Sequence, residues 1–332
     1  MPEINRFFAA VLSSAYLLFS FPLPVRAEDN LLTISSKNEW CEFAEHCRLD
    51  SYSADLTVKL TSDIDLSDTD SFSVPYFGGS FDGQGNRIYG IKEDNTQGIF
   101  RIVGENAVIC DLKCEAEAAG SQTENSAILC GVNKGTIRNC SVSGKLNADT
   151  AAGGIAGRNE ENAVITGCVS DVSVHGSSKI GGIAGVNSGL VENCKNSGAV
   201  NEDAEENSVY IGGICGYNEG IITGCENTAN IGYPHTGYYI GGIAGLSSGY
   251  IGECSNSGEL NGRRNVGGIA GLMEPHYRLE FGENAMELLS DDTNELISSL
   301  NTAVKSLEVA SDDGVTGVNE AVSQIHEFEY WL

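Results

Sequence analysis

Short alternating stretches separated by glycines fill the middle of the chain. The block Gly-Gly-Ile-Ala-Gly, or a close variant of it, occurs five times, and its central Ile residues lie 28, 31, 29 and 26 positions apart: Ile155, Ile183, Ile214, Ile243 and Ile269. The segments between the glycines are short, β-branched and alternating, which predicts strands rather than helices. A repeat of this length indicates stacked supersecondary units. The pattern therefore predicts an all-β solenoid in which each unit is one parallel coil.

Alignment of the units shows three further columns of equivalent residues. An Asn or Ser follows the central Ile by four positions: Asn159, Asn187, Asn218 and Ser247. Cysteines and then aliphatic residues occupy the other two columns: Cys140, Cys168, Cys194, Cys225 and Cys254, followed by Leu146, Val174, Val200, Ile231 and Leu260. Stacked coils place equivalent residues about 4.8 Å apart. We expect apolar stacks inside the coils, an Asn column that satisfies turn amides, and glycines where the coil turns sharply.

The two ends of the array have a different pattern. Residues 28–58 are predicted to form an N-terminal capping segment, with Ser36 as helix N-cap, Glu39 in the first turn, and Trp40, Phe43 and Ala44 on one apolar face. The β-helix itself is predicted over residues 59–275. Open solenoid ends expose strand edges, so a covering segment is expected.

A helical pattern replaces the repeat over residues 276–332. Its apolar positions have a heptad-like 7-4-3-4-3 spacing: Leu289, Leu296, Leu300, Ala303, Leu307 and Ala310. This seam can pack on the last coil or on another chain, and the sequence favours neither. The final helix reaches Leu332 without a stop signal, which is consistent with a truncated region or a fragment.

The first 27 residues resemble an export signal. An apolar run from Phe7 to Phe21 follows Arg6, and small residues precede a cleavage point after Ala27. No other stretch approaches the ~20 apolar residues of a membrane span. We therefore predict an extracellular or cell-surface protein with no stable membrane span after cleavage.

The net charge limits which partners the chain can bind, and the positions of the cysteines indicate whether they form disulfides. The formal net charge of −27 disfavours nucleic acid and anionic membranes. An exported chain with 11 cysteines would ordinarily suggest disulfides. Five of them form one column, however, and stacked residues lie farther apart than the roughly 3.8 Å between the Cβ atoms of a disulfide. We predict free, buried thiols in this column.

Several blocks together resemble the GLUG-motif proteins of Gram-positive, mostly clostridial, gut bacteria. The resemblance covers roughly residues 30–280 and rests on the Gly-Gly-Ile-Ala-Gly units, the leader segments 47–51, 60–66 and 77–86, the block 232–235 and the array end at 273–275. It implies a right-handed β-helix in a large cell-surface protein. A similar repeat occurs in immunoglobulin-A-cleaving metallopeptidases, so a peptidase site has to be considered.

No catalytic constellation emerges from the sequence. The zinc motif HExxH needs two His four residues apart, but His326-Glu327 is followed by Tyr330 where the second His belongs. A polysaccharide lyase needs a basic residue beside calcium-binding acids, and the pair Arg263-Arg264 has no nearby Asp in sequence. We predict no enzyme activity and no cofactor, with a carbohydrate-active β-helix enzyme kept as the alternative.

Two segments are candidate binding sites. Acidic residues cluster after the first strands and offer oxygen ligands for calcium, although turn capping is the favoured explanation: Asp63, Asp65, Asp68 and Asp70. An aromatic-rich stretch is interpreted as an insertion between coils, and it is the preferred surface for host glycans or surface proteins: Tyr233, His235, Tyr238 and Tyr239. The predicted function is a non-catalytic stalk, adhesin or binding scaffold. A further alternative is the N-terminal non-catalytic region of a larger surface peptidase.

Overall fold

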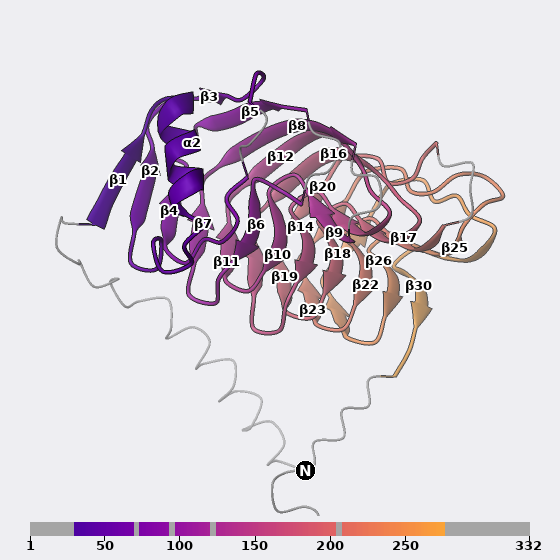
Figure 1. Ribbon diagram of the computed structural model, residues 1–332. Coiled ribbons are helices and arrows are strands. Elements are labelled where there is room, and N and C mark those ends of the chain that lie inside the picture. Colours follow the sequence, from indigo (N-terminus) through magenta and orange to yellow (C-terminus); the bar gives the residue numbers. More distant parts are fainter. Residues whose placement is uncertain (1–29, 70–72, 93–96, 120–123, 204–207, 276–332) are drawn as a thin grey trace, which may run out of the picture. The chain divides into compact units, whose positions relative to one another are not determined.

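A computed structural model describes residues 30–69, 73–92, 97–119, 124–203 and 208–275 (Figure 1). The chain divides into two compact units, Met1–His276 and Tyr277–Leu332, and every described residue belongs to the first. The predicted signal peptide (1–27), the helical region (276–332) with its apolar seam, and the pair His326-Glu327 lie outside the described residues.

Four parallel sheets run along the axis of the described unit (Figure 1). Sheet A has nine strands: β1 (Leu31–Ile34), β2 (Thr57–Leu60), β4 (Ser80–Asp82), β7 (Val108–Cys110), β11 (Thr136–Arg138), β15 (Val164–Thr166), β19 (Leu190–Glu192), β23 (Ile221–Thr223) and β27 (Tyr250–Gly252). Sheet B has eight: β3 (Ile64–Asp65), β5 (Arg87–Ile91), β8 (Lys113–Ala119), β12 (Ser141–Asn147), β16 (Val169–His175), β20 (Lys195–Asn196), β24 (Glu226–Asn227) and β28 (Ser255–Asn256).

The other two sheets contain the repeat block. Sheet C has seven strands: β6 (Phe100–Val103), β10 (Cys130–Asn133), β14 (Ala156–Asn159), β18 (Ala184–Asn187), β22 (Cys215–Asn218), β26 (Ala244–Ser247) and β30 (Ala270–Met273). Sheet D has six: β9 (Glu124–Ala127), β13 (Thr150–Gly153), β17 (Ser178–Gly181), β21 (Val209–Gly212), β25 (Tyr238–Gly241) and β29 (Arg264–Gly267). The coil that starts at β14 passes through sheets C, A, B and D before β18 starts the next coil.

All strand pairs in the sheets are parallel and join neighbouring coils. On sheet A, for example, Ile137 pairs with Ile165 and Ile165 pairs with Val191. The fold is a right-handed parallel β-helix, as predicted. Right-handed connections are the ones that twisted parallel strands favour.

The predicted apolar columns form the core. The central Ile side chains Ile155, Ile183, Ile214 and Ile243 are completely buried, and the Ile155 amide donates to the Ile183 carbonyl at 3.0 Å. The aliphatic column is joined by successive bridges from Val174 through to Leu260. These contacts confirm the register that the repeat predicts, because one residue of slip would turn each column toward solvent.

Helix α2 (Lys37–His46) begins where the sequence predicted. The Ser36 hydroxyl accepts from the Glu39 amide at 3.4 Å, while the Glu39 carboxylate accepts from the Ser35 amide at 2.7 Å. Those hydrogen bonds lower the pKa of Glu39. The segment before the helix also contains strand β1, which pairs with β2 and was not anticipated.

An aromatic cluster joins this helix to the first coils. The helical residues Trp40 and Phe43 are buried against Phe77, Phe81 and Phe100, with ring centroids 5.3 to 6.4 Å apart across the cluster. Most of these pairs are edge-to-face or tilted, as aromatic quadrupoles favour. Figure 1 shows α2 at the indigo end of the solenoid, and Trp40 of this helix contacts Phe81 of β4.

The first two glycines of each repeat block lie where the coil turns from sheet D to sheet C, as predicted, but backbone conformation is not the reason for them. None of them has a positive φ, so they are not corners that need left-handed backbone. Apart from Gly268, these glycines leave no room for a Cβ: a Cβ on Gly182 would lie 2.2 Å from Asn196 Cγ, and one on Gly216 would lie 2.2 Å from the Lys179 backbone carbon. The residue with left-handed backbone lies two positions before the block instead. Ala151, for example, has a φ of 54°.

Two asparagine ladders run along the axis. The predicted ladder links Asn133, Asn159, Asn187 and Asn218 through amide-to-amide hydrogen bonds of 2.8 Å and ends on Ser247 at 3.0 Å. A second ladder, absent from the sequence analysis, joins Asn196, Asn227 and Asn256 at 2.9 and 2.7 Å. Each of its members lies two residues after a column Cys. Its side chains occupy the space that the second glycine of the block leaves open.

Candidate functional site

A cluster of tyrosines lies along sheet D and the adjoining edge of sheet C. The rings of Tyr210 (β21) and Tyr239 (β25) stack with centroids 5.2 Å apart and an interplanar angle of 23°. The Tyr217 ring (β22) lies 6.3 Å from that of Tyr210. All three side chains are partly exposed. We call these three residues the tyrosine face.

The coil register creates this stack. Val209 pairs with Tyr238 and Ile211 pairs with Ile240, which places Tyr210 and Tyr239 at the same position of successive coils. Both have left-handed backbone, with φ of 61° and 58°. Asn125 and Asn265 occupy the same place in β9 and β29 with the same conformation, φ 58° and 56°. A side chain at this position points outward, because its neighbour Ile240 fills the core.

Cations border the tyrosines. The Lys179 ammonium lies 5.4 Å from the Tyr217 ring centroid, and the Arg263 guanidinium lies 5.9 Å from that of Tyr238. Both distances are in the range of cation–π attraction. Arg263, one of the basic residues considered for a lyase, is thus positioned against an aromatic ring.

The structure separates the predicted aromatic stretch into two parts. Tyr233 and the exposed His235 lie in the turn before β25, where the Tyr233 carbonyl accepts from the Thr236 amide at 3.3 Å. Tyr238 and Tyr239 belong to the regular strand β25, so interpreting them as an insertion was wrong. Tyr210 was missed by the sequence reasoning. Its signal was its position two residues before the first glycine of the block, which Tyr239 shares.

The acidic residues after the first strands make separate hydrogen bonds with different neighbours. Asp63 accepts from the Arg87 amide at 2.8 Å, and Asp65 accepts from the Ser67 amide at 2.9 Å and from the Ser67 hydroxyl. The Ser67 hydrogen bonds lower the pKa of Asp65. Asp68 is exposed, and Asp70 lies outside the described residues. Calcium binding by this cluster stays a prediction.

A groove follows the turns between sheets C and A. Its apolar floor contains Val164, Leu190 and Ile221, and it ends at Tyr250, which is 62% exposed. Glu161 and Glu219 lie along it. This groove is on a different sheet from the tyrosine face and provides a second candidate surface.

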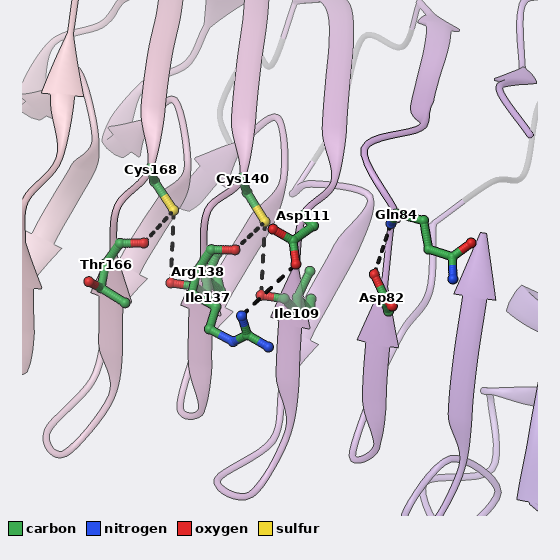
Figure 2. Close-up of polar contacts among 9 residues, drawn as sticks. All are labelled: Asp82, Gln84, Ile109, Asp111, Ile137, Arg138, Cys140, Thr166 and Cys168. Atoms are coloured by element: carbon green, nitrogen blue, oxygen red, sulfur yellow. Dashed lines mark hydrogen bonds and ion pairs between the residues drawn. The ribbon is translucent and has the colours of Figure 1, made fainter. Parts of the chain in front are cut away.

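The cysteines are all free thiols, as predicted for the column. Each column Sγ approaches a backbone carbonyl, for example Cys140 to Arg138 at 3.4 Å and Cys168 to Thr166 at 3.4 Å (Figure 2). Outside the column, burial raises the pKa of Cys215 to about 12. These thiols therefore contribute to packing and hydrogen bonding in the core.

We expect iodoacetamide to label Cys41 of the folded protein in preference to the fully buried cysteines. Cys41 is partly exposed on α2, whereas Cys130 and Cys215 are fully buried. The thiolate is the reactive form, and burial disfavours it. Peptide mass spectrometry after a short exposure at pH 8 should find Cys41 modified and Cys215 unmodified, with both modified in urea. Equal labelling of the two in the folded protein would contradict the buried assignment.

Comparisons with known proteins agree with the fold. No family model matches the chain, and no curated protein matches it. Among solved structures, it is similar to one from Bacteroides ovatus described as a "putative immunoglobulin A1 protease", with a TM-score of 0.57 and 18% identity over 75% of this chain and 85% of that one. A structure described as an IgA1 protease gives a TM-score of 0.42 and 12% identity, over 78% of this chain and 21% of that one. At 18% identity, the likeness to the Bacteroides ovatus structure concerns the β-helix fold alone.

The described part of the chain contains no helix with the length and apolar character needed to cross a bilayer.

Proposed function

We propose that this chain is an exported, non-catalytic β-helix that acts as a binding scaffold at the cell surface. The observation that carries the proposal is the stacked, partly exposed pair Tyr210 and Tyr239 on a rigid sheet. The core columns and both Asn ladders have structural roles, whereas the tyrosine rings point outward from them. Binding sites on rigid strands hold their side chains in place before the ligand arrives, which lowers the entropy cost of binding.

The proposed ligands are glycans of the host. The two partly exposed tyrosine rings offer apolar surface together with hydroxyl groups, which suits the apolar faces and hydroxyls of sugar rings. The net charge of −27 opposes phosphate-rich ligands such as nucleic acid. A surface protein of the host is the competing partner, and the experiment below distinguishes it.

Replacing both Tyr210 and Tyr239 by Asn is expected to weaken glycan binding at least tenfold. Asn is chosen because Asn125 and Asn265 occupy the same left-handed position, so the backbone is preserved. Loss of two stacking rings removes roughly 1 kcal/mol or more each, the scale of aromatic contacts. Binding to mucin glycans on an array, followed by titration of the best ligand, measures the change.

Tyr250→Ala is the matched control for this experiment. It removes an exposed tyrosine from the groove on sheet A and leaves the tyrosine face intact. Unchanged glycan affinity in the double Asn variant, with an unchanged melting temperature, would refute the tyrosine face as the site. Loss in Tyr250→Ala alone would move the site to the groove. Binding to deglycosylated host proteins would favour a protein partner.

The similar structure suggests a second candidate function. Because that protein is described as an immunoglobulin A1 protease, this chain is also a candidate for the non-catalytic region of a larger surface peptidase. Sequencing beyond the codon for Leu332 tests this directly, since a downstream HExxH motif is required. Turnover of a polysaccharide panel, with and without calcium, would instead support a carbohydrate-active enzyme.

A further inference from the structure

Three potential metal ligands meet on the outer part of sheet A near the start of the solenoid. Asp82 ends β4 and Cys110 ends β7, and the two residues are register partners. Asp111 follows with left-handed backbone, φ 53°. The Sγ of Cys110 and one carboxylate oxygen of each Asp all lie within 4.8 Å of one another. Figure 2 shows Asp82 and Asp111 on these neighbouring strands.

The repeat alone does not account for this combination of side chains. The column that contains Asp82 and Cys110 continues with Arg138, Thr166 and Glu192. The position of Asp111 is taken by Asn139 in the next coil, also with left-handed backbone. Within the described residues, the thiol and two carboxylates come together at this one level.

The thiol of Cys110 is buried without the backbone partner that the column thiols have. Only 7% of Cys110 is exposed. The Sγ atoms of Cys140 and Cys168 each donate to carbonyls, whereas no carbonyl partner is found for Cys110 in the described part of the chain. The thiol has the Asp111 side chain as its hydrogen-bond partner instead, and Arg138 and Asp82 are its other charged neighbours. The pKa of Cys110 is raised to about 12, chiefly by burial, with Arg138 lowering it and Asp111 and Asp82 raising it.

Each of the two carboxylates has a partner in the structure, but neither partner prevents it from binding a cation. One oxygen of Asp82 accepts from the Gln84 amide at 2.9 Å, which fixes the group and leaves the other oxygen available. One oxygen of Asp111 lies 3.9 Å from the Arg138 guanidinium, a long and partly exposed ion pair. Such a pair contributes little and can be displaced by a stronger cation. The two Asp side chains are partly exposed, so solvent and ions reach the cluster.

We propose that Asp82, Cys110 and Asp111 bind a borderline-soft divalent cation of the zinc type, with water as the fourth ligand. Sulfur and carboxylate together suit Zn²⁺, while calcium and magnesium select oxygen alone. Zn–S bonds of about 2.3 Å and Zn–O bonds of about 2.0 Å require ligand atoms roughly 3.5 Å apart. Because the atoms lie within 4.8 Å of one another, the side chains need to close by about 1 Å at most on binding. The Cys110 S–H bond breaks, the proton passes to solvent, and the S–metal bond forms.

Cobalt titration of the reduced full chain tests the site. Co²⁺ substitutes for Zn²⁺, and a thiolate ligand gives a charge-transfer absorption that oxygen ligands do not. We expect this band to saturate at one equivalent and to disappear on addition of excess Zn²⁺. A pH indicator should record release of one proton per metal at neutral pH.

Variants that use residues found at the same position of other coils test whether the absorption band comes from Cys110 or from another thiol. Cys110→Thr, a residue that Thr166 supplies in the same column, is expected to abolish the band, and Asp82→Asn to weaken binding at least tenfold. Cys215→Ala is the control, because Ala184 and Ala244 occupy its column, and it should keep the band. No thiolate band in the wild type, or a band that persists in Cys110→Thr, would overturn the proposal. Circular dichroism establishes that each variant is folded.

Discussion

Replacing Cys194 by Asp is expected to unfold the middle of the solenoid at neutral pH. Cys194 is 1% exposed, and its Sγ lies 3.2 Å from the Glu192 carbonyl and 3.7 Å from the Ile165 carbonyl. A carboxylate there would face two carbonyl oxygens with no cation to balance it. Burying such a charge costs several kcal/mol, roughly 3–5 by comparison with broken buried ion pairs.

The pH dependence of this variant has a definite sign. Burial among carbonyls raises the pKa of the introduced carboxyl above its value in the unfolded chain. The variant is therefore most stable relative to wild type below the unfolded pKa, about 4 for Asp. It loses stability as pH rises through the higher folded value. Urea unfolding at pH 4 and pH 7, in both proteins, should show a gap that widens with pH.

Cys194→Ser is the matched control, because its hydroxyl can still donate to the Glu192 carbonyl. We expect a loss of about 1 kcal/mol for the smaller, more polar atom. A pH-independent difference, or equal melting temperatures for the Asp variant and wild type, would contradict the buried register of the column. Hydrogen exchange should show the defect spreading to β23 and β24, since the Cys194 amide donates to Cys225 Sγ at 3.5 Å.

The sequence was sufficient for the parts of the fold that recur at fixed positions. The Ile, Cys, aliphatic and first Asn columns were predictable because successive copies share them, and stacking turns a shared position into a contact. The second Asn ladder was less visible because it begins at Asn196, where Ser170 precedes it in the same register. Strand β1 was missed because a helix and a long turn separate it from its partner β2.

The candidate sites depend on what differs between coils, which a repeat alignment does not reveal. Tyr210 and Tyr239 share a register position with Ala151 and Lys179, so no residue type marks that position. Asp82 and Cys110 lie in upstream coils where the repeat is degenerate, and only the register brings them together. Functional side chains can vary at such outward positions because the core columns already fix the fold.

Adding a single methyl group at Gly213 is expected to destabilise the protein strongly, whereas the same change at Gly268 should have little effect. Both are the second glycine of the repeat block. A Cβ at Gly213 would lie 2.2 Å from the Gly242 carbonyl oxygen and 2.4 Å from Asn227 Cγ, while one at Gly268 would meet no atom within 4 Å. Neither glycine has a positive φ, so backbone strain does not separate the two variants.

The loss of stability at Gly213 comes from two neighbours that cannot move away from the added methyl group: the backbone of the next coil and the Asn227 side chain. The Gly242 oxygen belongs to the backbone of the next coil, and Asn227 is tied to Asn196 at 2.9 Å and to Asn256 at 2.7 Å. Moving Asn227 breaks buried hydrogen bonds, and moving the backbone separates two coils. We expect Gly213→Ala to lose about 3 kcal/mol, the upper range for overpacking. Gly268→Ala should stay within about 0.5 kcal/mol. Urea unfolding of both variants measures the difference, and equal stabilities would contradict the lack of space for a Cβ at Gly213.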